Sequence, residues 1–194
     1  MKSAKTERKD RSREKILASA GSLIRERGIS GTSVAGVMDG AGMTVGGFYA
    51  HFPSKQSLVA ETMRETLRQS RGRLEEGAND LRGEEWVMAV SRSYLSRAHR
   101  DHPEQGCPLP TTLGELTREE PAVRKVLADE LDGMVSEIAS HLAEAGVDDS
   151  RGEALATFAV MVGGLTLARA LKGETLSDAM LKACRHHLER SRPE

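Results

Sequence analysis

The chain is poor in aromatic residues. Of its 194 residues only one is Trp, two are Tyr and three are Phe. Aliphatic and methionine side chains must therefore fill most of the hydrophobic core, which is typical of packed helices. The hydrophobic content of 38% and the charged content of 29% are ordinary for a soluble protein. The length fits one large domain, or a small domain joined to a larger one.

Cysteines and catalytic motifs are also scarce. Cys107 and Cys184 offer no disulfide framework and no metal-binding spacing. His99 and His102 lie three residues apart, but the neighbouring carboxylates do not complete a ligand set, so we expect surface histidines and no metal. Neither GxGxxG nor Walker spacing is present, and no Ser-His-Asp or Cys-His group can be assembled. The sequence therefore predicts no cofactor and no enzymatic activity.

No segment is typical of a signal peptide or a membrane span. The first residues are charged and lack the apolar region of an export signal. The most apolar stretch, residues 154–171, is interrupted by Thr157, two glycines, Thr166 and Arg169. A membrane helix needs about 20 mostly apolar residues and resists a charge. We expect a buried helix here and a cytoplasmic protein with no membrane partner.

The charge is unevenly distributed, although the net charge is only −1. Residues 1–55 contain ten Lys and Arg against five Asp and Glu, whereas residues 56–194 contain eighteen against twenty-four. A basic amino-terminal part is suited to meet phosphate groups. A solvated basic surface is the plain alternative, and charge alone leaves both open.

The segment GAGMTVGGFYAHFPSKQSL, residues 40–58, is the most informative part of the sequence. It holds three of the six aromatic residues within five positions. The preceding TSVAGVMDG predicts a short helix, and Ala41-Gly42 predict a tight turn before a second short helix. A helix, a glycine turn and a second helix make the helix-turn-helix arrangement, whose second helix enters the major groove of DNA.

The same region resembles the signature of TetR/AcrR-type transcriptional regulators over roughly residues 10–60. The positions that carry the resemblance are Thr32, Ser33, Val34, Ala41, Gly42, Thr44, Gly46, Phe48, Tyr49, His51, Phe52, Lys55 and Leu58. Beyond residue 60 the resemblance rests on length and helical layout. It implies an all-helical homodimer with an amino-terminal DNA-binding unit and a carboxy-terminal domain that binds a small inducer.

Side chains around the second helix have distinct expected roles. Thr44 and Val45 lie at its start, where base edges and thymine methyl groups are reached. Tyr49 and His51 are expected to contact phosphates, with ordinary surface residues as the alternative. Lys55 lies at the next helix start, a position that suits a phosphate. The expected DNA-binding residues are Thr32, Ser33, Thr44, Val45, Gly46, Gly47, Phe48, Tyr49, His51 and Lys55.

Some of these residues also have structural roles. Gly46 and Gly47 leave one edge of the short helix without side chains, so its backbone can approach a large partner closely. Phe48 and Phe52 are four residues apart, share a helix face and are expected in the core. Thr32 is a candidate N-cap for the first helix of the pair.

Helical spacing and turn residues predict an all-α fold with about nine helices. Besides the helix-turn-helix pair, the expected helices span residues 11–28, 53–77, 84–102, 109–116, 121–145, 153–171 and 176–190. We expect a three-helix DNA-binding domain over residues 1–52, whose residues 1–10 form a flexible basic arm. Residues 53–194 are expected to form a helical ligand-binding and dimerisation domain.

The inducer pocket is expected among the helices of the second domain. Candidate wall residues are Trp86, Met88, Tyr94, Cys107, Leu109, Leu113, Met134, Ile138, His141, Phe158 and Met161. For each of them ordinary core packing is the open alternative. An apolar wall with few aromatic residues fits a small hydrophobic or amphipathic inducer.

Cys107 is in addition a candidate redox or electrophile sensor. It lies between Gly106 and Pro108, where a helix is expected to begin, and a helix amino terminus lowers the pKa of a thiol. His99 and Arg100 are close enough in sequence to add positive potential. The segment also resembles one in a subset of TetR-type regulators, some of which respond to electrophiles or oxidants through a cysteine there. A plain packing role is the alternative.

Two consecutive glycines lie midway along the apolar helix. Gly163 and Gly164 need a reason, because glycine costs about 1 kcal/mol relative to alanine inside a helix. Close approach of a partner helix is favoured, since the resemblance implies pairing of the last two helices; a pocket or packing within the chain is open. Together with Leu167 they form the expected dimer interface.

The sequence as a whole predicts a transcriptional regulator, most simply a repressor. It is expected to bind a palindromic operator in double-stranded DNA as a homodimer and to be released by a small inducer, an electrophile or an oxidant. A helical enzyme or a protein-interaction adaptor with a vestigial DNA-binding head is the alternative. The basic amino-terminal part and the pattern of Tyr49, His51 and Lys55 argue against it.

Overall fold

The structure, a computed structural model, describes residues 4–190, and within them it contains helices and loops but no strand. The elements are α1 (Ala4–Arg27), α2 (Val34–Gly40), the 3₁₀ helix η1 (Val45–Ala50), α3 (Lys55–Glu75), α4 (Gly83–Tyr94), α5 (Arg97–Asp101), the 3₁₀ helix η2 (Pro103–Gln105), α6 (Leu109–Leu116), α7 (Pro121–Glu144), α8 (Ser150–Ala170) and α9 (Thr175–Arg190). The all-α prediction is confirmed.

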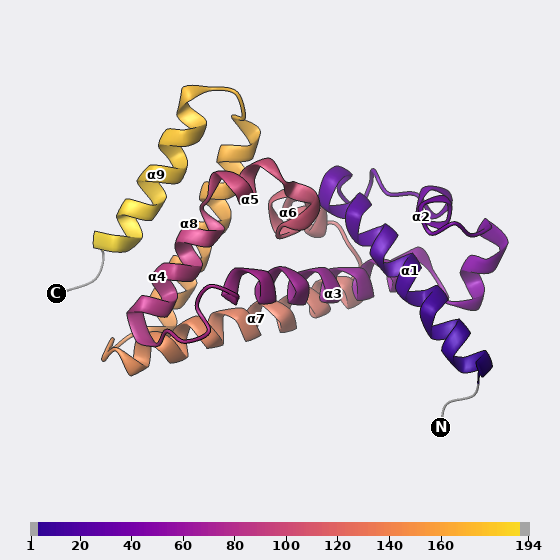
Figure 1. Ribbon diagram of the computed structural model, residues 1–194, viewed down its shortest axis with the longest axis horizontal. Helices are drawn as coiled ribbons and strands as arrows, with labels where there is room; N and C mark the ends of the chain where they lie inside the picture. The colour runs from indigo at the N-terminus through magenta and orange to yellow at the C-terminus, as the bar shows by residue number, and fades with distance from the viewer. Residues whose placement is uncertain (1–3, 191–194) are drawn as a thin grey trace.

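The helices form a small head and a longer bundle (Figure 1). In that view α1, α2 and η1 lie at the right, while α8 and α9 lie at the left. Helices α3 and α7 pack side by side along the bundle, and α3 continues directly from the head. Helix α6 packs against both α1 and α8, so it lies between the head and the bundle.

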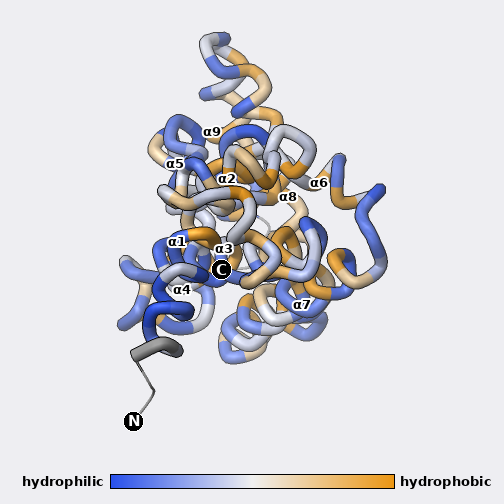
Figure 2. Tube along the Cα trace, turned by 90° about the vertical axis from the view of Figure 1, so that its right-hand side faces the viewer, coloured by the Kyte–Doolittle hydropathy of each residue, from blue (hydrophilic) through white to orange (hydrophobic). Residues whose placement is uncertain are grey.

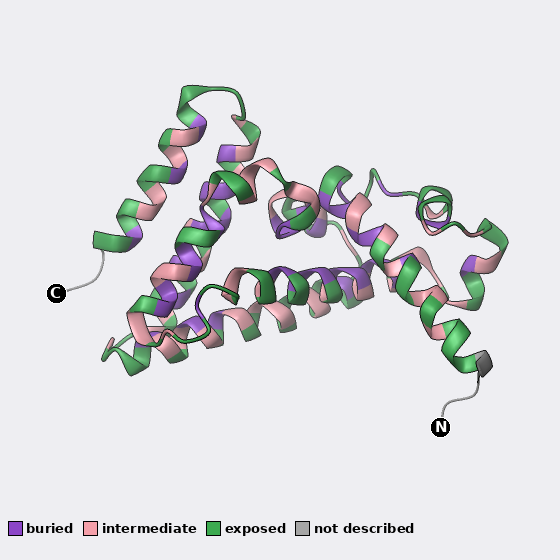
Figure 3. Ribbon diagram, viewed as in Figure 1, coloured by how far each residue is buried: buried purple, intermediate pink, exposed green. Residues whose placement is uncertain are grey.

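Each part has its own hydrophobic core. The head core consists of Ile16, Ala20, Val37, Met38, Phe48, Phe52 and Leu58. The bundle core is larger and includes Ile24 and Ile29 from the head side, together with inward residues of α3, α4 and α6–α9. Figure 3 shows the buried positions following one side of α3, α4 and α8, as amphipathic helices require. Because α1 and α3 contribute to both cores, movement of the bundle can reach the head.

Serine side chains define where two helices begin. Ser33 is the N-cap of α2, and its hydroxyl accepts the N–H of Gly36 at 3.0 Å. The prediction that Thr32 caps this helix is wrong, because the Thr32 hydroxyl is buried and donates to the Gly28 carbonyl at 2.7 Å. Ser54 caps α3 in a capping box with Ser57, which pairs the N–H groups of both serines at the start of the helix.

Helix α1 begins earlier than predicted. It starts at Ala4, so residues 4–10, expected to be a flexible arm, continue the helix; residues 1–3 of that arm lie outside the described residues. The first turns are polar and appear mostly blue near the amino-terminal end of the trace in Figure 2. The basic residues of this segment therefore lie along a helix that leads into the head.

The predicted helix over residues 84–102 is two helices. Helix α4 ends at Tyr94, and Ser96 caps α5 by accepting the N–H of His99 at 3.1 Å. The backbone carbonyls at the break are bonded by side chains, because His99 Nδ1 lies 2.8 Å from the Tyr94 oxygen and Arg185 of α9 donates to the Leu95 oxygen. His99 is a local partner, but Arg185 is supplied by a tertiary contact, which local periodicity does not reveal.

Helix α8 is the one described helix that is long and apolar enough, by length and composition, to cross a membrane. It packs against α7 and α9 within the bundle, and 39% of its most apolar 18-residue window is buried. Three leucines remain half-exposed on or near it, namely Leu155, Leu167 and Leu176. A bundle helix with one uncovered apolar face accounts for this composition.

Candidate DNA-binding site and ligand pocket

The short helix η1 divides its side chains sharply between the core and the surface. Phe48 is fully buried, whereas Val45 is 49% exposed and Tyr49 is 72% exposed. Thr44, the N-cap of η1, is also exposed. The Phe48 ring stacks on Phe52 with a centroid separation of 5.8 Å and anchors the helix from below. The aromatic core is thus confirmed, and Phe48 supports the surface rather than being part of it, as does the buried Thr32.

Glycine at positions 46 and 47 is not required by packing within the chain. A Cβ atom at Gly46 would meet nothing within 4 Å, and one at Gly47 would make an ordinary contact of 3.8 Å with Met38. The two glycines therefore leave a low, open surface beside Thr44 and Val45. Such a surface suits close approach by a large external partner.

Arg13 of α1 fixes the end of η1, a role that the sequence analysis missed. It donates to the His51 carbonyl, forms a salt bridge with Glu61 of α3 and lies 4.2 Å over the Phe52 ring. Its position in the basic run of residues 9–15 was the only sequence signal. Arg13 therefore ties α1, η1 and α3 together while adding positive charge beside the exposed surface.

His51 has its two ring nitrogens in different environments. Nδ1 is buried and, among the described residues, has no hydrogen-bond partner. Burial lowers the pKa of His51, and the positive charges of Lys9 and Arg13 act in the same direction. A neutral ring carries one hydrogen, on either of its nitrogens. With the hydrogen on Nε2, the ring can donate one hydrogen bond to an external oxygen without taking up a proton.

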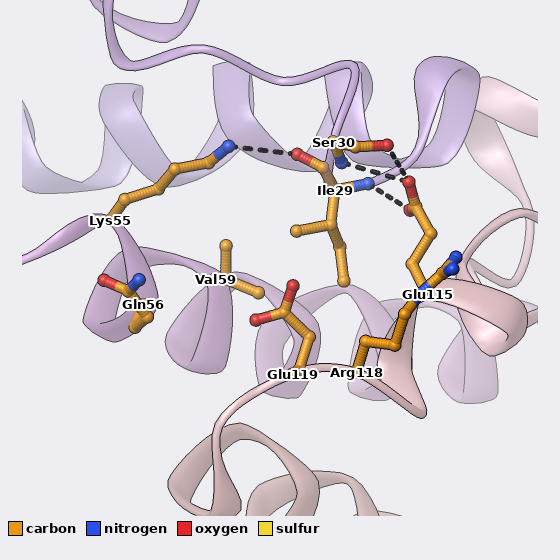
Figure 4. Close-up of a pocket in the computed structure, with 8 residues that line it drawn as sticks. All are labelled: Ile29, Ser30, Lys55, Gln56, Val59, Glu115, Arg118 and Glu119. Atoms are coloured by element: carbon orange, nitrogen blue, oxygen red, sulfur yellow. Dashed lines mark hydrogen bonds between the residues drawn. The ribbon is translucent and has the colours of Figure 1, made fainter.

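A second polar site lies where α6 meets the head (Figure 4). The Glu115 carboxylate accepts the N–H groups of Ile29 at 2.6 Å and of Ser30 at 3.1 Å, and also the Ser30 hydroxyl. Lys55 donates to the Ile29 carbonyl from the other side at 3.2 Å. Gly28, with φ of +75°, ends α1 and leaves the space that Glu115 occupies. Glu115 thus connects α6 to the α1–α2 loop beside a pocket of about 300 Å³.

We expect Glu115→Gln to lower the free energy of unfolding by about 1–2 kcal/mol, because hydrogen bonds to a carboxylate are stronger than those to an amide. Burial raises the pKa of Glu115, but the donors of Ser30 and Ile29 outweigh it and hold that pKa below 4.5. The contribution is present at neutral pH and is lost as the pH falls through the lowered native pKa. Urea unfolding at two pH values measures it.

Glu119→Gln is the matched control, since Glu119 lines the same pocket and Figure 4 draws no hydrogen bond to it. Its stability should change by less than about 0.5 kcal/mol. Equal losses of stability in Glu115→Gln and Glu119→Gln would show that Glu115 does not hold the loop.

The bundle contains a small, mostly apolar pocket of about 40 Å³, here called the inner pocket. Its lining residues are Ser70, Arg71, Leu74, Glu75, Trp86, Tyr94, Cys107, Met134, Glu137, Ile138, Phe158 and Met161. The structure thus brings together seven of the expected wall residues, namely Trp86, Tyr94, Cys107, Met134, Ile138, Phe158 and Met161. The polar members on α3 and α7, above all Arg71, Glu75 and Glu137, were missed because helical periodicity assigns them to the surface.

Four expected wall residues lie elsewhere. Leu109 is fully buried in the bundle core, and Leu113 is 37% exposed on α6. His141 stacks on Trp86 with ring centroids 4.2 Å apart, outside the lining. Met88 is half-buried on α4, also outside it.

Cys107 lines the inner pocket, but the predicted low pKa is wrong. Burial raises the pKa of the Cys107 thiol, and the opposing contacts with Tyr94, the Leu109 N–H, Arg169 and Arg25 do not compensate. The thiol is 2% exposed, and α6 starts only at Leu109, so one N–H group alone reaches it. At neutral pH Cys107 is a thiol rather than a thiolate.

His99 supports the Cys107 backbone as a neutral ring. Nδ1 donates to the Tyr94 carbonyl, and Nε2 accepts the N–H of Cys107 at 2.8 Å. Burial lowers the pKa of His99 to about 4, and nearby Arg169 acts in the same direction. His99 was expected to add positive potential, but it is uncharged. Buried Arg25 and half-buried Arg169 supply that charge instead, and they bond the Gly106 and Cys107 carbonyls.

Stability should therefore depend on pH through His99. Between pH 6.5 and about 4 the unfolded chain binds a proton that the native ring does not, so stability rises with pH across this window. We expect a loss of about 2 kcal/mol between pH 7 and pH 5. Chemical denaturation of the wild type and of His99→Gln measures this loss. If His99→Gln loses as much stability between pH 7 and pH 5 as the wild type does, groups other than His99 cause the pH dependence.

The two central glycines of α8 have different environments. A Cβ atom at Gly164 would lie 2.6 Å from Cys184 Sγ and 3.1 Å from Leu95 Cδ2, so this glycine allows α9 and α4 of the same chain to pack closely. Its assignment to a dimer contact is therefore wrong. Gly163 is exposed, with nothing within 4 Å of its Cβ position, and Leu167 is 49% exposed.

Among residues 4–190 the structure groups no three metal-ligating side chains.

A helix-turn-helix head with an exposed second helix, joined to a helical bundle with its own pocket, defines a helix-turn-helix transcriptional regulator. The family of bacterial regulatory proteins named tetR matches residues 16–62. The family described as the transcriptional regulator LmrA/YxaF-like C-terminal domain matches residues 85–186. The chain belongs to the TetR family, with an LmrA/YxaF-like carboxy-terminal domain.

Relatives agree with this assignment. The chain is 26% identical over 170 residues to the HTH-type transcriptional regulator LmrA of Bacillus subtilis, covering 84% of this chain and 89% of LmrA. It is 36% identical over 55 residues to the HTH-type transcriptional repressor KstR2 of Mycolicibacterium smegmatis, covering 28% of this chain. That match spans only 27% of KstR2. Both relatives are named as transcriptional regulators.

Solved structures share the fold. A TetR transcriptional regulator from Chloroflexus aurantiacus has a TM-score of 0.79 at 24% identity, covering 94% of each chain. The reduced form of Escherichia coli NemR also has a TM-score of 0.79, at 18% identity, covering 92% of this chain and 95% of NemR.

Proposed function

We propose that this TetR-family regulator is a repressor that binds a palindromic operator as a homodimer and is released by a small inducer. The observation that carries the proposal is the surface of η1. Thr44, Val45 and Tyr49 are exposed, while Phe48 anchors the same helix in the head core. A fixed helix with outward side chains can read base edges without first becoming ordered. The repressor role is supported by the KstR2 similarity in the head.

Contacts to DNA divide into two kinds. Thr44 and Val45 meet base edges, whereas the Tyr49 hydroxyl, His51 Nε2 and Lys55 meet phosphates. Lys55 already donates to the Ile29 carbonyl, so its ammonium group is held at the start of α3 with donors left for a phosphate. The basic residues of α1 add to the attraction for the DNA backbone.

Variants of Lys55 and Tyr49 test this division. Lys55→Ala should weaken operator and random duplex alike and reduce the salt slope by about one unit, because one phosphate contact is lost. Tyr49→Phe should weaken both several-fold without changing the slope, since the hydroxyl is uncharged. Thr44→Ala should change the preferred base instead. Fluorescence anisotropy across salt concentrations measures all three, and wild-type affinity in the Tyr49/Lys55 double variant would refute the assignment.

The dimer is proposed to form through α8 and α9. Gly163, Leu155, Leu167 and Leu176 present small or apolar side chains to solvent on these helices. An uncovered apolar face of this kind is typical of an interface between subunits. A two-fold dimer presents two copies of η1 to two half-sites, which is why a palindromic operator is expected.

The inducer is proposed to bind at the inner pocket. Cys107 lies at the pocket, α6 begins two residues later, and Glu115 near the other end of α6 holds the head loop. A ligand that shifts this corner would move α6 and, through Glu115, the head. Arg25 adds a second connection, since this α1 residue donates to the Gly106 carbonyl at 3.0 Å.

Release by an electrophile or oxidant at Cys107 is the other branch of this proposal. The position of the thiol at the pocket favours it, whereas burial and the raised pKa oppose it. Comparing operator release by a quinone in the wild type and in Cys107→Ser decides between a sensor and a packing residue.

We also propose that the chain divides into a DNA-binding domain of residues 1–52 and a ligand-binding and dimerisation domain of residues 53–194. We propose a cytoplasmic location, where operator DNA is found.

A further inference from the structure

The Tyr94 hydroxyl is a buried group that needs a partner. Tyr94 is 3% exposed and lines the inner pocket. Among the described residues no nitrogen or oxygen atom forms a hydrogen bond with its hydroxyl, and the adjacent Cys107 thiol is only a weak partner. A buried hydroxyl without a full hydrogen bond is unfavourable. A ligand oxygen that accepts this hydrogen would therefore gain affinity.

The inner pocket is lined by two polar groups whose neighbouring charges have opposite signs. Close to Tyr94 and Cys107 are the guanidinium groups of Arg169 and Arg25, which bond the Cys107 and Gly106 carbonyls. The second group, here called the Arg71 end, has Arg71 between two carboxylates, 2.9 Å from Glu75 and 2.5 Å from Glu137.

The Arg71 end of the pocket has one more carboxylate than it has cations. Burial raises the pKa of Glu75, and the neighbouring charge of Glu137 adds to this. The Glu75–Glu137 end therefore favours an additional positive charge, and it disfavours an additional negative one.

The pocket must open to receive a ligand. Its volume of about 40 Å³ is far below the roughly 150 Å³ that holds a benzene-sized molecule. The salt bridge from Arg71 on α3 to Glu137 on α7 closes this side. A cationic group that replaces Arg71 on Glu137 would remove this link between α3 and α7, although Arg64 and Arg68 of α3 still bridge Glu130 of α7. Helix α3 leads directly into the head.

We propose that the inner pocket takes a small amphipathic molecule with a hydrogen-bond acceptor at one end and a protonated amine at the other. The acceptor bonds the Tyr94 hydroxyl, the amine lies at Glu75 and Glu137, and molecules that end in a carboxylate are rejected. This ligand class rests on the proposed inducer-binding function.

Three matched probes test it by calorimetry on the full chain. They are 4-acetylbenzylamine, which has both groups, 4-acetylbenzoate, which has the wrong charge, and 4-ethylbenzylamine, which lacks the acceptor. In the wild type the first should bind about tenfold more tightly than the second and about fivefold more tightly than the third. Equal affinity of the amine and the carboxylate, or no binding of any probe at millimolar concentration, would overturn the proposal.

Two near-isosteric variants assign the effects. Tyr94→Phe should abolish the advantage of the acetyl over the ethyl group and leave the charge preference intact. Glu137→Gln should reduce the charge preference and leave the acetyl advantage intact. Thermal unfolding confirms that each variant is folded, and either variant alone can refute its half of the assignment by keeping the wild-type ratio.

Operator affinity is measured separately, because it distinguishes a failure of inducer release from a failure of the proposed ligand class. If the probes bind in the expected order without changing operator affinity, inducer release fails and the ligand class stands. If operator binding is intact but the probes do not follow the order, the ligand class fails and the DNA-binding function stands.

Discussion

Gly164→Leu should destabilise the chain by at least about 3 kcal/mol. A Cβ atom at this position already falls 2.6 Å from Cys184 Sγ and 3.2 Å from Cys184 Cβ, and the remaining carbons of leucine have no space between α8 and α9. Overpacking of a core typically costs about 1–3 kcal/mol, more when the backbone must move. The roughly 1 kcal/mol gained in helix propensity does not offset this. Urea unfolding followed by circular dichroism measures the loss.

Gly163→Leu is the matched control, one residue away in the same helix. Its Cβ atom would meet nothing within 4 Å, so the variant should fold with a stability equal to or above that of the wild type. If α8 and α9 form the dimer, the added leucine should separate the subunits, and light scattering should detect monomers. Wild-type stability of Gly164→Leu would contradict the packing account, and a full-strength Gly163→Leu dimer would place the interface elsewhere.

Gly46→Leu should reduce operator affinity by about 100-fold or more while leaving the fold intact. Within the chain this position is open, since its Cβ would meet nothing within 4 Å, and its backbone is not in the left-handed region. On DNA the added side chain would hold η1 away from the groove and lengthen every base contact beside it. Loss of a set of such contacts costs several kcal/mol, because each is worth about 1–3 kcal/mol.

Gly72→Leu controls for the substitution itself. Gly72 lies on α3, is exposed and also has nothing within 4 Å of its Cβ position. This variant should bind the operator as tightly as the wild type. Anisotropy titrations of both variants, with thermal unfolding to confirm folding, complete the comparison. Operator binding by Gly46→Leu at wild-type strength would mean that η1 does not enter the groove.

Most helices could be predicted because their signals are local. Pro121 at the start of α7 and the apolar spacing in α8 lie within the helices that they define. The break between α4 and α5 could not, because it depends on Arg185, which lies 90 positions away from Leu95. The early start of α1 was missed because polar residues give no apolar periodicity.

The exposed and buried sides of η1 were predicted better than the pocket for the same reason. The outward positions of Thr44 and Tyr49 follow from the spacing of Phe48 and Phe52 within one short segment. By contrast, Glu115 reaches Ile29 across 86 positions, and Arg71 meets Glu137 only because α3 and α7 pack together. The pKa of Cys107 was predicted with the wrong sign because its burial depends on the whole bundle.

Selection of DNA fragments from a random duplex pool by the full chain, followed by sequencing, tests the central claim most directly. The account predicts an imperfect palindrome, whose two half-sites lie about 10 base pairs apart or a multiple of that spacing, because a two-fold dimer presents η1 twice. Variants at Thr44 should select an altered base in both half-sites at once. A pool with no enriched sequence, or one unchanged by substitution at Thr44 and Gly46, would contradict operator recognition by η1.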